Sequence, residues 1–129
     1  MIGLLLITHD TLGEALVQCA CHVLNKRPPQ LLQLGVAAGD DPNDLLPLAR
    51  QLLKLVDTGE GVLLLTDIYG ASPSNLAAKL LDAGKVEGLA GANLPMLMRA
   101  INYRDKGMET LLMRATGGGR DGVLNMLKH

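Results

Sequence analysis

A chain of 129 residues with 48% hydrophobic content has the size of one globular domain with a substantial core, so we expect a single domain over residues 1–129. Twelve basic residues stand against thirteen acidic ones, a formal charge of -1, and no cluster of Lys and Arg is present that would favour a nucleic-acid partner. The only aromatic residues are Tyr69 and Tyr103, so the base-stacking surface typical of single-strand binding proteins is also missing.

Short apolar runs alternate with longer amphipathic stretches, a pattern that predicts an α/β fold with a mostly parallel sheet. In chain order the predicted elements are strand 1–7, helix 11–25, strand 31–36, helix 43–56, strand 61–66, helix 73–83, strand 86–92, and helices 94–103 and 108–115. The apolar residues 123–127 predict a short last strand. We therefore expect four parallel strands with helices on both faces, and an edge strand near the C-terminus.

The opening run and the cysteines bear on the compartment. Residues 2–7 have no basic leader and are too short for a signal-peptide core or a membrane span, so we expect a cytoplasmic protein. The first helix carries regularly spaced apolar residues, namely Leu12, Leu16, Cys19 and Val23. On that helix Cys19 and Cys21 point to different faces, which argues against a disulfide or a metal site, and we interpret both as small buried residues.

Several familiar chemistries lack their motifs. Residues 117–122 formally match G-x-G-x-x-G, but they follow a predicted helix rather than a strand, so we interpret them as a helix stop and hinge. The phosphate loop G-K-[ST], the zinc motif H-E-x-x-H and the nucleophile elbow G-x-S-x-G are all missing. We expect neither a cofactor nor a metal.

The polar residues that follow two predicted strands form the candidate site. His9 ends the first strand, Asp67 ends the third, and Ser72 opens the helix after it. Because ligands of open α/β sheets bind beyond the carboxyl ends of the strands, these residues are expected to share one site. Phosphoryl transfer through histidine suits them: His9 would be the nucleophile, Asp67 would fix its tautomer, and the amides near Ser72 would hold phosphoryl oxygens.

Each of these residues also has a purely structural interpretation. A lone histidine in a βα turn is commonly a surface residue, Asp67 alone can cap a turn, and Ser72 followed by proline is a sufficient helix start. The coincidence of all three favours the functional interpretation. Of the other histidines, His22 falls on the polar face of the first helix and His129 is the last residue.

Three segments together resemble the mannose-type EIIA domains of the bacterial phosphotransferase system. They are Ile7-Thr8-His9, the run from Gly61 to Asp67 that continues as D-x-x-G-x-S-P-x-N to Asn75, and Gly91-Ala-Asn-Leu-Pro95-Met96. The resemblance spans nearly the whole chain. It implies a parallel four-stranded sheet, phosphorylation of His9 with Asp67 as its hydrogen-bonding partner and Ser72 as a phosphate-binding residue, and a homodimer in which residues 123–127 are the exchanged strand.

The resemblance also implies partners. The small carrier HPr would be the phosphoryl donor, and a IIB protein or domain the acceptor, with the membrane reached only through a transporter complex. The chain departs from many relatives by carrying Ile68 and Tyr69 after the aspartate, and by ending at His129 without a IIB domain. Two alternatives stay open: a phosphoryl donor subunit for dihydroxyacetone kinase, and a regulatory binding module that has no role in transport.

Overall fold

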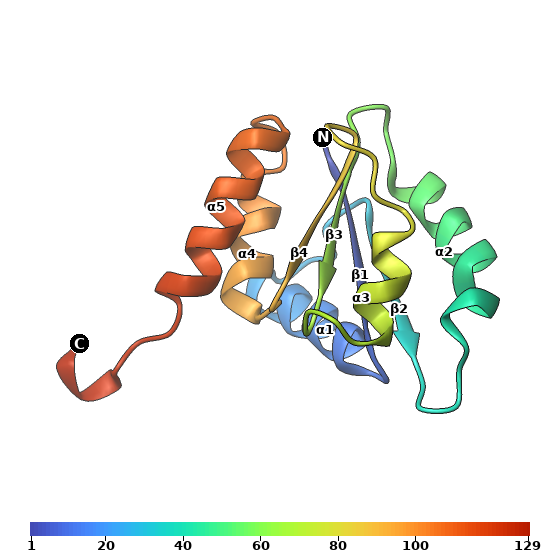
Figure 1. Ribbon diagram of the computed structural model, residues 1–129. Helices are drawn as coiled ribbons and strands as arrows, with labels where there is room; N and C mark the ends of the chain where they lie inside the picture. The colour runs from blue at the N-terminus through green and yellow to red at the C-terminus, as the bar shows by residue number, and fades with distance from the viewer.

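The computed structural model describes residues 1–129 as a four-stranded parallel sheet flanked by helices, with the strand order β2-β1-β3-β4 (Figure 1). The strands are β1 (Gly3–His9), β2 (Leu31–Val36), β3 (Val62–Thr66) and β4 (Val86–Ala90). The helices are α1 (Leu12–Leu24), α2 (Pro42–Val56), α3 (Ser72–Ala78), α4 (Leu94–Tyr103) and α5 (Met108–Asp121), followed by a 3-10 turn at Met126–Lys128. The predicted α/β fold with four parallel strands is confirmed.

The central strands β1 and β3 explain why the core is aliphatic. Leu4 and Leu6 of β1 pack into one buried cluster with α1, α4 and α5, whereas Leu5 and Ile7 pack into a second cluster with α2 and α3. A strand covered by helices on both faces needs apolar side chains at every position. The uninterrupted leucine runs in the sequence are the consequence.

One charged residue is buried beneath the amino ends of the strands. Arg104 is 3% exposed, and its guanidinium donates hydrogen bonds to the carbonyls of Ile2 (2.8 Å), Pro29 (2.6 Å) and Gln30 (2.5 Å). Burial lowers the pKa of Arg104, and the nearby Asp105 carboxylate partly opposes this shift. The side chain therefore ties the start of β1, the start of β2 and the end of α4 together.

The glycine-rich segment 117–122 does not end a helix as the sequence led us to expect. Helix α5 continues through it to Asp121. A Cβ atom at Gly118 would lie 2.6 Å from Cβ of Arg99, and one at Gly119 would lie 3.0 Å from Cε of Met96. These glycines let α5 approach α4 closely, and this packing offsets their poor helix propensity.

The predicted helix 73–83 is also shorter than expected. Helix α3 ends at Ala78, and the chain then turns through Gly84, whose φ of +82° few other residues adopt readily, to enter β4.

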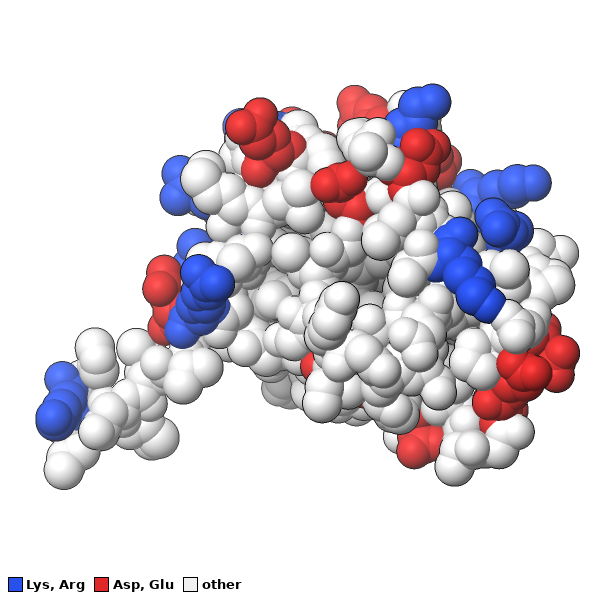
Figure 2. Space-filling view, in the orientation of Figure 1, with Lys and Arg blue, Asp and Glu red and all other residues white.

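Residues 123–127, the predicted last strand, form no strand in the single chain. They leave the body as an extended tail that closes in the 3-10 turn (Figures 1 and 2). Val123, Met126 and Leu127 are 78%, 89% and 95% exposed. A strand needs a neighbouring strand for its backbone hydrogen bonds, and within one chain this segment has none.

The cysteines correct a further expectation. Both thiols are free, but Cys19 is exposed and only Cys21 is partly buried, so the interpretation of Cys19 as a core residue was wrong. None of the helices combines the length and the apolar character that crossing a membrane would require.

Candidate functional site

The sheet brings the ends of β1 and β3 together. The two strands are direct neighbours, and Ile7 pairs with Thr66 in the register. His9 is the last residue of β1 and Asp67 follows the last residue of β3, so both lie at the same carboxyl edge of the sheet. This is the edge at which open α/β sheets bind their ligands.

Asp67 makes two hydrogen-bonding contacts with His9, one to its backbone and one to its ring. Its Oδ2 accepts a hydrogen bond from the His9 backbone N–H at 2.9 Å and lies 2.8 Å from Nδ1 of the ring. Its Oδ1 accepts from the backbone N–H of Ile68 at 3.1 Å. Because an ionised carboxylate can only accept, Nδ1 carries the proton and the lone pair of the neutral ring lies on Nε2.

Exposure differs between the two partners. The His9 side chain is 46% exposed, whereas that of Asp67 is 10% exposed. Burial raises the pKa of Asp67, but the hydrogen bonds from the backbone and ring of His9 outweigh that effect and hold the pKa of Asp67 below its ordinary value. The site therefore combines an accessible imidazole with a carboxylate that stays ionised near neutral pH.

The turn between β1 and α1 fixes the backbone of His9. Asp10 has a φ of +46°, an uncommon value for a residue other than glycine, and its N–H donates to the carbonyl of Val36 at 3.0 Å. A Cβ atom added to Gly35 would lie 2.1 Å from the carbonyl oxygen of Asp10. On the other side, Oγ1 of the buried Thr8 accepts from the N–H of Gly13 at 2.7 Å.

Sequence reasoning assigned no role in this site to Thr8, Asp10 or Gly35. The signal available for Gly35 was its place inside an apolar strand, because an isolated glycine there often marks a close backbone approach. The left-handed conformation of Asp10 had no comparable signal.

Ser72 lies at the start of α3, and its phosphate-binding role stays a prediction. It is the first residue of α3 rather than its N-cap, which is Ala71, and no side chain caps this helix. The Ser72 residue is exposed, and its hydroxyl makes no hydrogen bond to His9, Asp67 or any other residue. The structure therefore joins His9 to Asp67 directly and leaves Ser72 as a free hydroxyl five residues beyond Asp67.

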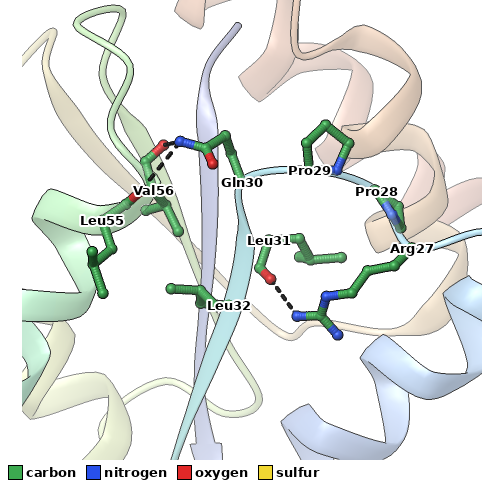
Figure 3. A pocket seen from close by; sticks show the side chains of 8 residues that line it. All are labelled: Arg27, Pro28, Pro29, Gln30, Leu31, Leu32, Leu55 and Val56. Carbon is green, nitrogen blue, oxygen red and sulfur yellow. Dashed lines mark hydrogen bonds between the residues drawn. The ribbon is translucent and has the colours of Figure 1, made fainter.

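A cavity of about 310 Å³ lies far from this edge, between the start of β2 and the end of α2 (Figure 3). The Arg27 guanidinium donates to the carbonyl of Leu31 at 2.7 Å, and the Gln30 amide donates to the carbonyls of Leu55 at 3.2 Å and Val56 at 3.4 Å (Figure 3). These hydrogen bonds join residues of the cavity walls to one another. We interpret it as a structural hollow at the amino ends of the strands.

Comparison with known proteins decides the family. Residues 3–115 match the family model described as PTS system fructose IIA component. The chain belongs to this IIA family of the phosphotransferase system. The resemblance drawn from the sequence is thereby confirmed, and members of the family are components of phosphotransferases.

Relatives of this IIA chain include longer proteins. It is 30% identical over 125 residues to the PTS system mannose-specific EIIAB component of Escherichia coli K12, covering 95% of this chain and 38% of that protein. The chain thus spans well under half the length of the first relatives it matches. It is also 29% identical to the putative phosphotransferase enzyme IIA component YadI of the same organism, over 81% of this chain and 72% of that one.

Solved structures support the fold of this IIA chain. The EIIA component from Streptococcus agalactiae matches with a TM-score of 0.87 at 20% identity and covers all of both chains. The mannose/sorbose-specific IIA subunit from Enterococcus faecalis matches with a TM-score of 0.84 at 20% identity, over 96% of this chain and 93% of that one.

Proposed function

We propose that this IIA chain is a phosphocarrier that accepts a phosphoryl group on Nε2 of His9 and passes it to another protein. The observation that carries the proposal is the 2.8 Å contact between Nδ1 of His9 and Oδ2 of Asp67. That contact leaves the lone pair on Nε2 of an accessible ring. A neutral imidazole held in one tautomer is a competent nucleophile.

The transfer step follows from this geometry. The Nε2 lone pair forms a bond to phosphorus while the bond from phosphorus to the donor's imidazole nitrogen breaks, and the electron pair of that bond stays on the donor ring. Positive charge then develops on the His9 ring, where the ionised Asp67 offsets it. Passage to the acceptor is the same exchange with His9 as the leaving group.

Ser72 is proposed as a ligand of the phosphoryl oxygens. The residue is exposed, its hydroxyl makes no hydrogen bond within the chain, and it begins α3 five residues beyond Asp67. A hydroxyl and backbone N–H groups at this position are the donors that phosphate oxygens require.

The proposed partners are HPr as donor and a IIB protein or domain as acceptor. The similarity to a mannose-specific EIIAB component supports a IIB acceptor, since that relative has a remainder beyond the region this chain matches. A role in sugar uptake is proposed on the same basis.

A homodimer is also proposed, formed when the tail residues 123–127 pair with the free edge of β4 in a second copy. The tail is apolar and exposed, and the surface over α3 and β4 carries few charges (Figure 2). Sedimentation of the full chain and of a chain truncated after Asp121 would test it: a dimer that becomes monomeric is expected, and a monomeric full chain would contradict the proposal.

Labelling tests the phosphocarrier function. Incubation with phosphoenolpyruvate, enzyme I and HPr is expected to place one acid-labile, base-stable phosphoryl group on each chain. The His9→Gln variant should remain unlabelled, while His129→Gln, which alters the exposed histidine at the last position, should label like the wild type. Full labelling of His9→Gln would refute the assignment.

A further inference from the structure

The loop that holds Asp67 presents two apolar side chains to solvent. Ile68 and Tyr69 follow Asp67 directly, and they are 57% and 86% exposed. The Ile68 backbone N–H donates to Oδ1 of Asp67 at 3.1 Å, while Oδ2 of the same carboxylate lies 2.8 Å from Nδ1 of His9. The exposed pair therefore begins at the carboxylate that orients the reactive histidine.

The pair lies beside a hollow on the same face of the sheet as the His9 side chain. Side chains alternate along a strand, and His9 continues the series of Leu5 and Ile7, which pack against α2 and α3. Tyr69 lines a hollow of about 110 Å³ between α3 and β4, whose walls are mostly apolar. Thr66 lines it as well; it is 4% exposed, and its hydroxyl has no hydrogen-bond partner within the chain.

Ile68 lies within the area that a phosphoryl-donor protein covers. The contacts through Asp67 place the Ile68 backbone within about 10 Å of Nε2 of His9. A specific protein interface covers roughly 800 Å² on each partner, which corresponds to a patch of about 16 Å radius. An interface centred near Nε2, where phosphorus must arrive, therefore includes Ile68 and extends to Tyr69.

The charge of the reactive edge defines the chemistry of that partner. The four loops at the carboxyl edge of the sheet are residues 10–11, 37–41, 67–71 and 91–93, and they contain four aspartates but none of the twelve basic residues. Figure 2 shows red atoms without blue ones along the lower right of the molecule. Because an incoming phosphoryl group is anionic too, these loops favour a partner that brings positive charge.

Resting on the proposed function, we propose that Ile68 and Tyr69 form the docking contact for the protein that donates the phosphoryl group to His9. The partner surface that fits them carries an apolar side chain next to its phosphohistidine, which packs on Tyr69 beside the hollow, and basic side chains that face the aspartates. Interfaces combine an apolar centre with a polar rim, and tyrosine is enriched among the residues that dominate binding energy.

Kinetics with phospho-HPr as the donor test the proposal. Tyr69→Ser and Ile68→Ser should each raise KM for phospho-HPr about fivefold or more and leave kcat within about twofold, because the contact holds the partner and not the His9 ring. Tyr69→Phe keeps the aromatic ring and should keep KM within about twofold of the wild type. Leu55→Ser is the matched control, since Leu55 is 65% exposed near the end of α2, and it should leave KM unchanged.

Three further measurements separate docking from chemistry. Phosphoramidate, a small phosphoryl donor that needs no docking surface, should label His9 equally fast in Tyr69→Ser and in the wild type. In the ¹⁵N-labelled wild-type chain, unphosphorylated HPr should shift the amide resonances of Ile68 and Tyr69 and leave that of Leu55 unchanged. Added NaCl should raise the wild-type KM for phospho-HPr, because salt screens the attraction to the aspartates.

The outcomes against the proposal are distinct. A KM that is unchanged in both Tyr69→Ser and Ile68→Ser, or that added NaCl does not raise in the wild type, would overturn the docking contact and leave the phosphocarrier function intact. Slower labelling of Tyr69→Ser by phosphoramidate would assign Tyr69 to the structure of the loop, and dissociation of a wild-type dimer by this variant would assign it to a subunit contact; either result would likewise overturn the proposal. Failure of the wild type to accept phosphate from phospho-HPr would instead refute the proposed function.

Discussion

Replacing Gly35 by alanine should displace the His9 side chain, although the added methyl group would contact the backbone of Asp10 and not His9 itself. The added Cβ would lie 2.1 Å from the carbonyl oxygen of Asp10 and 3.2 Å from its carbon, both rigid backbone atoms. The turn and β2 must separate by about 1 Å, at a cost of about 1–3 kcal/mol in the free energy of unfolding. Misplacement of a reacting group by about 1 Å lowers a rate by roughly a hundredfold.

We therefore expect Gly35→Ala to fold, to lose about 1–3 kcal/mol in urea denaturation, and to accept phosphate from phospho-HPr roughly a hundredfold more slowly. Gly39→Ala is the control, because no atom lies within 4 Å of a Cβ placed there. Quench-flow transfer rates and urea midpoints should be measured on both variants. A Gly35→Ala chain that is destabilised yet transfers within twofold of the wild type would refute the link between this contact and His9.

Two other side chains carry further predictions. Asp67→Asn should slow phosphoryl transfer from phospho-HPr by roughly thirty-fold to a thousand-fold, because a charged partner stabilises the transition state by about 2–4 kcal/mol. Circular dichroism should show an unchanged fold. A transfer rate within about threefold of the wild type would mean that Asp67 only stabilises the turn. Folding lowers the pKa of Asp67, so the ionised carboxylate contributes its full share to the free energy of unfolding above the ordinary pKa of 3.8. That contribution is lost as the pH falls through the lowered pKa of the folded chain. Urea midpoints measured below about pH 4 should therefore fall less in Asp67→Asn than in the wild type. Arg104→Met should lower the free energy of unfolding by about 2–4 kcal/mol in urea, because three buried carbonyls lose their donor, and a loss under about 0.5 kcal/mol would contradict that role.

The sequence predicted the sheet and the meeting of His9 with Asp67 because both follow from local signals. Continuous leucine runs indicate strands buried on both faces, and in parallel strands the residues after each run reach the same edge. The structure has the contact between the two residues, and their roles in phosphoryl transfer stay predictions.

The features that the sequence could not predict depend on which residues pack together in the folded chain. A glycine such as Gly118 predicts the end of a helix from the sequence alone. Here it continues α5, because only glycine leaves room for Arg99 of α4 at that contact. The apolar spacing of Leu12 and Val23 correctly predicts a helix, but periodicity does not say whether an apolar face meets the core or solvent. The residues 123–127 have strand-like composition and no strand to pair with inside one chain.

The central claim is that Asp67 directs phosphorus to one particular nitrogen of one particular histidine. Nitrogen and phosphorus NMR of the ¹⁵N-histidine chain after phosphorylation by HPr tests it directly. The account predicts a single phosphohistidine, His9, modified at Nε2, with Nδ1 still protonated against Asp67. A phosphoryl group on Nδ1 of His9, or on any other residue, would contradict it.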